Sequence, residues 1–413
     1  MLTSPVTPSA PTHAPGSAPT SSAHPTLPSA GLPTGQGVYS CSGPELTFDQ
    51  MHDLLRHDAR VKVAMIDIDG VFRCKTFLKE KVLSSFEDGF DFIPILFGWD
   101  VMDMPYTVPT PFGNAEEGFG DVWARLDTRS FRRLPLEDNM PFFLLRIADR
   151  AGRSIPVCPR TVLAKVMREY AELGLEPLCG IELEYFNFRE TPQSLAEKEG
   201  SKLEHITPGK FCFSVMRPFA EKAYFNDITE KCDQMGIPIE AMHTELGPGV
   251  YECALQYTNA MDLADRAAMF KMTVKQVALT HGMIASFMAK PVPNIPGCSG
   301  HMHMSIRHLA TGANAFFDPL AGPTPEDPYR AIGMSDTMSA FITGLLVGLP
   351  SILAILAPTV NSYKRLVENY WAPVFVSWAN QQRAAAVRVI IPMRPRAENT
   401  ADPSSATATR GAP

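Results

Sequence analysis

The stretch GIELEYF (residues 180–186) decides the fold, because acidic and apolar side chains alternate along it with a period of two. Residues two apart in a β-strand point to the same side of the sheet. The segment therefore predicts a strand within residues 178–187, with an apolar face and a face that carries Glu182 and Glu184. Two carboxylates about 4 Å apart repel by about 4 kcal/mol at an effective dielectric constant of about 20. Such a face favours a bound proton, a cation or an arginine.

Further charged side chains follow in four short segments. His301 and His303, in GCSGHMHMS (297–305), also stand two apart and predict a second strand with both imidazoles on one face. Glu245 and Glu252, in HTELGPGVYE (243–252), stand seven apart, so the glycines and proline between them must turn the chain for both to face one site. The segments NSYKRL (361–366) and NQQRAAAVR (380–388) then contribute positive charge through Arg365, Arg383 and Arg388.

Each segment alone has a plainer interpretation. The glutamate pair is also typical of a solvated strand face, the histidine pair of a structural or surface position, and the arginines of ordinary salt bridges. Together, four glutamates and a histidine without a thiolate motif favour Mg²⁺ or Mn²⁺, which prefer hard oxygen ligands. Arginines beside such ions are suited to phosphate and carboxylate groups.

Composition narrows the class of protein. The chain has 413 residues, of which 45% are hydrophobic and 20% charged, as in ordinary globular proteins. The net charge of −7 gives no reason to expect nucleic-acid binding. Eight scattered cysteines without a CxxC pair indicate reduced thiols and a cytoplasmic protein.

Two segments of unusual composition require a separate interpretation. Residues 1–45 are rich in proline, serine and threonine, which predicts a disordered tail, and they lack the features of a secretory or mitochondrial signal. The apolar run 338–358 is long enough to span a membrane. It contains Pro350 and two glycines, and polar motifs follow directly. We therefore expect a buried core helix and no membrane contact.

Two domains are predicted from the remaining pattern. A small β-rich domain over residues 55–150 has strands at 61–68 and 142–147, a hairpin turn at Asp69-Gly70, and loops with short strands over 98–127. The domain over residues 151–413 combines helices at 161–173, 222–235 and 260–281 with strands at 178–187, 300–307 and 385–392, which is an α+β pattern. The sequence DIDGV (67–71) also matches a phosphatase nucleophile motif, but the acidic pair which that chemistry needs does not follow, so the hairpin is favoured.

These motifs together resemble the glutamine synthetase family, in its bacterial-type (type I) branch, including relatives that γ-glutamylate amines. The resemblance runs from about residue 61 to residue 410. It implies a small N-terminal β-grasp domain followed by a large catalytic domain with a curved antiparallel sheet and flanking helices. It also implies a homo-oligomer of two stacked hexameric rings. The implied reaction uses ATP to form γ-glutamyl phosphate, from which ammonia or a small amine, such as a polyamine or ethanolamine, displaces phosphate.

The resemblance also implies a role for each matching residue. The metal nearer the glutamate would be held by Glu184, Glu245 and Glu252, and the metal at the ATP phosphates by Glu182 and His301. Arg383 and Arg388 would neutralise the transferred phosphoryl group. The remaining implied contacts are Gly297, Arg365 and Trp371 to the substrate, with His303 and Arg410 on the nucleotide side.

Three positions depart from the family's pattern. Trp371 stands where glutamine-forming members carry a glutamate that binds ammonium. This suggests another amine or another acid such as Glu368 or Asp100, and the alternative is that Trp371 is a packing residue. Pro296-Gly297 replaces an Asn-Gly that grips glutamate. The sequence GAP (411–413) stands where a metal-binding glutamate and an arginine are expected, so a catalytically impaired family member acting as a structural or regulatory subunit is the alternative.

Overall fold

The structure is a computed structural model that describes residues 43–108, 110, 120–328, 330–368 and 370–390, together with the backbone of Thr409–Arg410. Most of the predicted tail, the end of the strand expected at 385–392 and the side chain of Arg410 lie outside the described residues.

The N-terminal part is built on a mixed five-stranded sheet with the order β2-β1-β5-β4-β3. The central strands β1 and β5 run parallel, and the other pairs are antiparallel. The α1 and α2 helices belong to the apolar core on one face of this sheet. Its elements are α1 (Phe48–Leu54), β1 (Arg60–Ile66), β2 (Phe72–Leu78), α2 (Lys79–Ser84), β3 (Phe90–Phe92), the 3₁₀ helix η1 (Pro94–Phe97), β4 (Val122–Leu134) and β5 (Met140–Ala148).

The hairpin predicted around Asp69-Gly70 is confirmed. Strands β1 and β2 pair antiparallel from Arg60–Leu78 to Ile66–Phe72. Asp67 at the turn is buried, accepts hydrogen bonds from two backbone N–H groups and forms an ion pair with Arg73. These bonds give the DIDG sequence a structural role. Loops and short strands were expected over 98–127; the stretch ends instead in a long strand, because β4 begins at Val122 and runs to Leu134.

The C-terminal part is built on an eight-stranded sheet with the order β11-β12-β13-β10-β6-β8-β7, and β9 also pairs with β6. The strands are β6 (Leu175–Phe188), β7 (Ile239–Thr244), β8 (Val250–Asn259), β9 (Ile284–Ser286), β10 (Gly300–His308), β11 (Trp378–Asn380), β12 (Val387–Val389) and β13 (Thr409–Arg410). The helices are α3 (Pro159–Glu172), α4 (Pro192–Glu197), α5 (Met216–Ala220), α6 (Lys222–Gln234), α7 (Ala260–Thr280), α8 (Asp336–Leu356) and α9 (Val360–Arg365).

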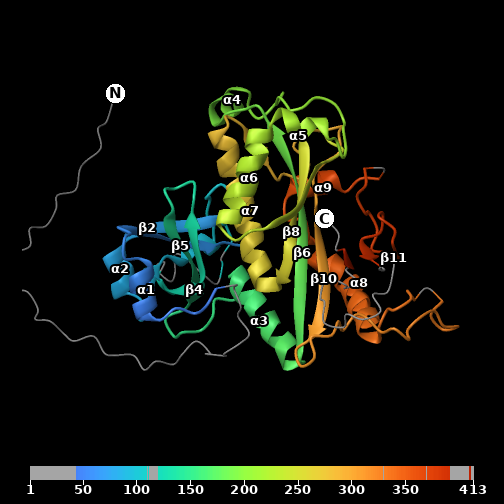
Figure 1. The fold of residues 1–413 in the computed structure, drawn as a ribbon, viewed down its shortest axis with the longest axis horizontal. Helices are drawn as coiled ribbons and strands as arrows, with labels where there is room; N and C mark the ends of the chain where they lie inside the picture. Colours follow the sequence, from blue (N-terminus) through green and yellow to red (C-terminus); the bar gives the residue numbers. More distant parts are fainter. Residues whose placement is uncertain are drawn as a thin grey trace, which may run out of the picture.

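One face of the large sheet is closed by helices. Figure 1 shows α6 and α7 side by side against β6 and β8, with the N-terminal domain on one flank and α8 and α9 on the other. The odd-numbered residues Leu183 and Tyr185 of β6 are buried in the core under these helices, and the Tyr185 ring meets Phe270 of α7 edge to face. The alternation of β6 therefore directs Glu182 and Glu184 to the opposite face.

Helix α8 departs from the expectation of a buried core helix. Its helical structure is confirmed, and it is long and apolar enough to cross a membrane, but only 11% of its most apolar window is buried. Met338, Ile342 and Leu349 pack with Val387 and Val389 of β12, whereas Val347 and Ile355 are exposed. Hydropathy was a poor guide to burial here, because only one side of the helix meets the sheet. That packing makes α8 part of the C-terminal fold.

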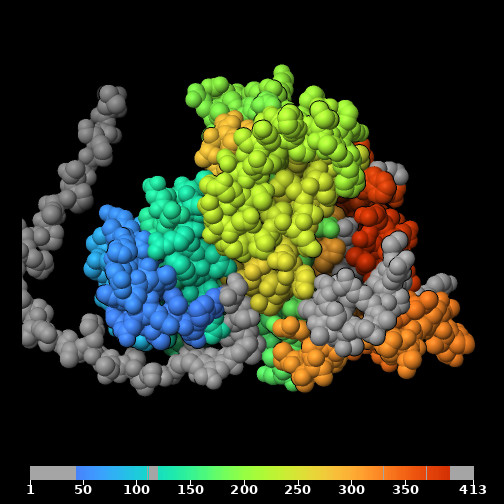
Figure 2. All heavy atoms as spheres, in the orientation of Figure 1, coloured from blue at the N-terminus to red at the C-terminus, as the bar shows by residue number. Residues whose placement is uncertain are grey.

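A buried ion-pair cluster joins the N-terminal sheet to helices α3 and α7 of the C-terminal part. Arg160 of α3 donates hydrogen bonds to Asp265 of α7 at 2.9 and 2.8 Å, and to Asp127 of β4 at 3.0 Å. Burial alone would raise the pKa of Asp127, but Arg160 and Arg146 overcome that effect and hold it at about 2. Figure 2 shows the blue and teal N-terminal domain in contact with the yellow-green body that this cluster helps to fix.

Replacing Arg160 by leucine should destabilise the protein strongly. The substitution leaves two buried carboxylates without their shared cation, and breaking a buried pair costs about 3–5 kcal/mol. Urea denaturation of Arg160→Leu and of Arg153→Leu tests this, because Arg153 pairs with Asp149 on the surface, where such pairs contribute less than about 1 kcal/mol. Equal losses in the free energy of unfolding would contradict the assigned role of the cluster.

Candidate active site

The sheet register brings the acidic and imidazole side chains into neighbouring positions. His301 of β10 lies directly opposite Glu182 of β6. Glu252 of β8 lies opposite Glu184 of β6, and His243 of β7 lies opposite Glu252. Directly opposed residues in a sheet project to the same side. Segments far apart in the sequence therefore present these groups on the face that α6 and α7 leave open.

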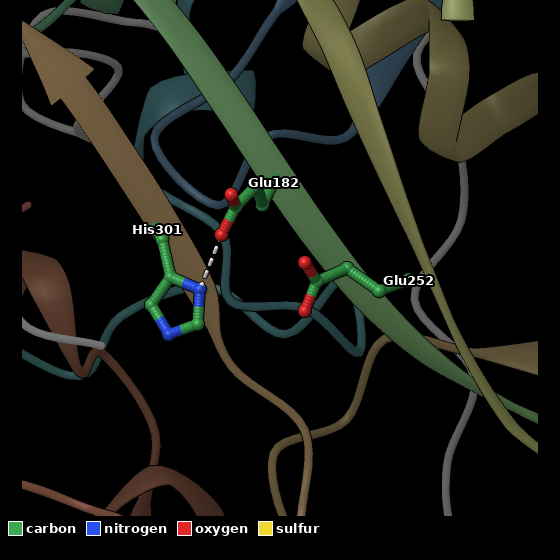
Figure 3. Close-up of side chains that lie close together, drawn as sticks. All are labelled: Glu182, Glu252 and His301. Atoms are coloured by element: carbon green, nitrogen blue, oxygen red, sulfur yellow. Dashed lines mark hydrogen bonds and ion pairs between the residues drawn. The ribbon is translucent and has the colours of Figure 1, made fainter. Parts of the chain in front are cut away.

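The first cluster consists of Glu182, Glu252 and His301, whose potential ligand atoms all lie within 4.8 Å of one another. Figure 3 shows the three side chains converging from three strands, with the His301 Nδ1 atom 2.8 Å from the Glu182 Oε2 atom. The other oxygen of Glu182 lies 3.1 Å from His303 Nε2. His303 is thus in contact with Glu182, although its buried Nε2 atom makes no hydrogen bond of good geometry.

The second cluster consists of His243, Glu245 and Glu252. His243 Nδ1 lies 3.6 Å from Glu245 Oε1, and His243 Nε2 lies 3.4 Å from Glu252 Oε1. The turn expected between the two glutamates is present: the Glu245 N–H donates to the Val250 carbonyl at 2.9 Å, and Gly249 has a φ of +67°. Because Glu252 belongs to both clusters, the two candidate cation sites are adjacent.

Glu184 completes the acidic surface. Its Oε2 atom accepts a hydrogen bond of 2.7 Å from the Ser299 N–H. Burial, reinforced by Glu252 and Glu245, raises the pKa of Glu184 to about 8, although Ser299 and Arg365 act in the opposite direction. Burial and Glu182 likewise raise the pKa of Glu252. Glu184 therefore retains a proton at neutral pH that a bound divalent cation would displace, and this set of carboxylates and imidazoles fits Mg²⁺ or Mn²⁺.

Arg365 is buried at the end of α9 beside this surface. Its Nη1 atom donates to the Tyr370 carbonyl at 3.0 Å, while its Nε atom is buried and makes no hydrogen bond. Gly297 packs under it: a Cβ atom there would lie 2.2 Å from the Ala289 carbonyl oxygen and 2.6 Å from Arg365 Cδ. The glycine at position 297 is therefore required for Arg365 to occupy this place.

The other predicted site residues differ in burial. Arg388 of β12 is buried, and its position is in register with Arg410 of β13, which in turn lies opposite His303. Arg388 thus belongs to the same sheet face as the clusters. Arg383 lies on an exposed turn. Trp371 is 71% exposed with a φ of +59°, a left-handed conformation that is uncommon for a bulky residue.

Sequence reasoning missed two residues of this surface. His243 precedes Glu245 by two positions, so the spacing rule applied to Glu182 and Glu184 would have found it. Cys212 lies beside Glu245, with its Sγ atom 3.8 Å from Glu245 Oε2. Nothing in the sequence indicates that a loop more than thirty residues upstream returns to this point.

The proton on Glu184 should make the metal-free protein less stable as the pH rises. The Glu184 carboxyl of the folded protein keeps its proton up to about pH 8, whereas the ordinary pKa of a glutamate is 4.5. The stability contributed by this proton is complete below the ordinary pKa and is lost as the pH rises through the folded pKa. Urea denaturation in excess chelator should show a decline in the free energy of unfolding between pH about 5 and about 8 that is smaller in Glu184→Gln. The same decline in both proteins would contradict the assignment.

Comparison with known proteins agrees with the fold. Residues 156–406, more than half of the chain, match the family model "Glutamine synthetase, catalytic domain". "Type-1 glutamine synthetase 2" of Dictyostelium discoideum is 41% identical over 330 residues, covering 80% of this chain and 61% of the relative. "Glutamate--isopropylamine ligase" of a Pseudomonas species is 29% identical over 331 residues, covering 80% of this chain and 70% of the relative.

The fold has a match among solved structures. The structure "Apo GmaS without ligand" superposes with a TM-score of 0.69 at 24% identity, covering 87% of this chain and 74% of that one. This likeness concerns the fold alone. The chain spans 61% to 70% of the length of the two curated relatives above. The matched family model, with the α+β fold that surrounds the acidic face, shows that this chain belongs to the glutamine synthetase family.

Proposed function

We propose that the protein is an ATP-dependent γ-glutamyl ligase that joins glutamate to ammonia or a small amine. The observation that carries the proposal is the convergence of four glutamates and two histidines on one sheet face beside the buried Arg365. In this reaction an oxygen of the γ-carboxylate bonds to the γ-phosphorus of ATP, and ADP leaves. The amine nitrogen then bonds to the γ-carbon, phosphate leaves and the amine loses a proton.

The acidic face divides between two cations in this proposal. Glu184, Glu245 and Glu252, joined by His243, would hold the ion nearer the glutamate. Glu182, Glu252 and His301 would hold the ion at the nucleotide phosphates. Such ions, when bound, would offset the charge of the reacting oxygens, and the protein would contribute mainly positioning. His303 contacts Glu182, Arg388 would face the phosphoryl group from β12, and Arg383 would be a further cationic contact.

A cavity further along the same strands suits the rest of the nucleotide. It has a volume of about 400 Å³ and is lined by Glu176, Leu178, Tyr257, Arg266 and Arg307, among others. Glu176 lies on β6 six residues before Glu182, hence on the same face and about 20 Å away. Tyr257 offers a ring for stacking a base. The phosphates would then extend toward the first cluster.

Glutamate would bind at the other end of the site. The guanidinium of Arg365 is suited to a substrate carboxylate, and Gly297 keeps that guanidinium in place. Trp371 follows Tyr370, whose carbonyl accepts from Arg365. Its exposed indole would hold an ammonium or alkylammonium group by cation–π attraction of about 0.5–2 kcal/mol. The Pseudomonas relative named as an isopropylamine ligase supports an alkylamine acceptor.

Location and assembly follow the family expectation. We place the enzyme in the cytoplasm, where thiols stay reduced, and the seven cysteines that the structure describes are free. We also propose that it forms a homo-oligomer arranged as two stacked hexameric rings. The exposed apolar residues along α8 support association between chains, since monomeric proteins rarely expose large apolar patches.

Phosphate release tests the proposed function directly. The purified protein, supplied with glutamate, ATP, Mg²⁺ and a panel containing ammonia, isopropylamine, ethanolamine and polyamines, should release phosphate with at least one amine. Glu245→Gln should abolish the release, because the substitution removes a carboxylate charge from the cation site. Absence of release with every amine, in protein shown to be folded, would reject the ligase proposal.

Position 371 should control the choice of amine. Trp371→Glu replaces a cation–π surface by a carboxylate, so the ratio of kcat/KM for isopropylamine to that for ammonia should fall by roughly two- to thirtyfold. Phe375→Glu is the matched control, because Phe375 has the same exposure in the same segment. An unchanged ratio in Trp371→Glu, or an equal fall in both variants, would contradict the role of Trp371.

A further inference from the structure

A buried lysine lies in the loop between β9 and β10, close to the proposed glutamate end of the site. Lys290 is only 9% exposed, and its ammonium contacts two neutral groups. It donates a hydrogen bond to the Ile295 carbonyl and lies 4.4 Å from the centroid of the Tyr370 ring. Burial, with a smaller effect of Arg365, lowers the pKa of Lys290. Because burying a charge is costly, this position suggests a role that an apolar side chain of the same length would not fill.

The backbone of Lys290 is paired with helix α9. The Lys290 N–H donates to the Asn361 side-chain oxygen at 2.6 Å, and the Asn361 amide nitrogen donates back to the Lys290 carbonyl at 2.8 Å. Asn361 lies in the first turn of α9, and Arg365 is the last residue of that helix. The two bonds therefore tie the loop to the helix that carries the arginine.

The ammonium end of Lys290 reaches two segments that touch Arg365. Lys290 lies over the Tyr370 ring, and the Tyr370 carbonyl accepts from Arg365 Nη1 at 3.0 Å. Ile295, whose carbonyl accepts from Lys290, stands two residues before Gly297, the glycine that packs under Arg365. Lys290 thus contacts three segments that meet around one guanidinium: α9, the segment at Tyr370 and the loop before Gly297.

We propose that Lys290 is a positioning residue for the Arg365 guanidinium and, through it, for a carboxylate of the bound glutamate. Arg365 donates through Nη1, while its Nε atom is buried without a hydrogen bond. The segments that surround the guanidinium must therefore set the direction of its plane, and a two-point contact with a carboxylate requires that direction to be fixed. The part of the inference that concerns glutamate rests on the ligase proposal, whereas the fixing of Arg365 does not.

Hydrogen exchange of the full chain, followed by mass spectrometry, tests the positioning without any substrate. The Val367 N–H donates to the Arg365 carbonyl at 2.9 Å. Lys290→Met keeps the length of the side chain but removes the ammonium. Peptides that contain Val367 should then exchange roughly two- to thirtyfold faster, the range expected for the loss of a cation–π contact. Lys75→Met is the matched control and should leave this exchange unchanged, because Lys75 lies at the same distance, 4.4 Å, from the Phe92 ring in the N-terminal domain.

Steady-state kinetics test the link to glutamate. In Lys290→Met the KM for glutamate should rise by roughly two- to thirtyfold. The values of kcat and of the KM for ATP should change little, because a contact that is equally strong in the ground state and the transition state affects KM alone. Lys290→Arg, which keeps a cation beside the Tyr370 ring, should recover most of the loss.

Two results would overturn the proposal. One is unchanged exchange at Val367 in Lys290→Met, in protein shown by urea denaturation to be folded. The other is a rise in the KM for ATP as large as the rise for glutamate, which would mean damage to the whole site. If no amine supports phosphate release, the ligase proposal fails, and the exchange comparison still decides the role of Lys290.

Discussion

Repulsion among the carboxylates on one face of the large sheet is the constraint on which the site depends. Glu182, Glu184, Glu245 and Glu252 gather where the register of β6, β7, β8 and β10 places them, and burial makes their charge costly. Without a cation, the protein meets this cost by retaining protons. A pair of divalent ions would meet it better, and would at the same time prepare the surface for phosphate.

The remainder of the fold serves to hold that face rigid and open. Helices α6 and α7 cover the opposite side of the sheet, and the apolar half of β6 is buried beneath them. The Arg160 cluster fixes the N-terminal domain against this body. Residues buried on one face of the large sheet thus determine the spacing of the charged side chains on the other face.

Much of this arrangement was accessible from sequence, because strand alternation is a local rule. It placed Glu182 with Glu184 and His301 with His303, and the glycine-rich turn after Glu245 was expected from its odd spacing. His243 stands two residues before Glu245, so the same rule reaches it. The contact between Cys212 and Glu245 is made by a loop and is recognised only in the structure. The prediction that the apolar run 338–358 is buried was wrong, because hydropathy does not indicate which sides of a helix have neighbours.

The central claim is that the two clusters bind two adjacent cations. Crystals grown with Mn²⁺ and a non-hydrolysable ATP analogue, with diffraction recorded at the manganese absorption edge, provide the most direct measurement. The account predicts two anomalous peaks, one between Glu182, Glu252 and His301 and the other between His243, Glu245 and Glu252. An intact sheet with no peak among these side chains would contradict it.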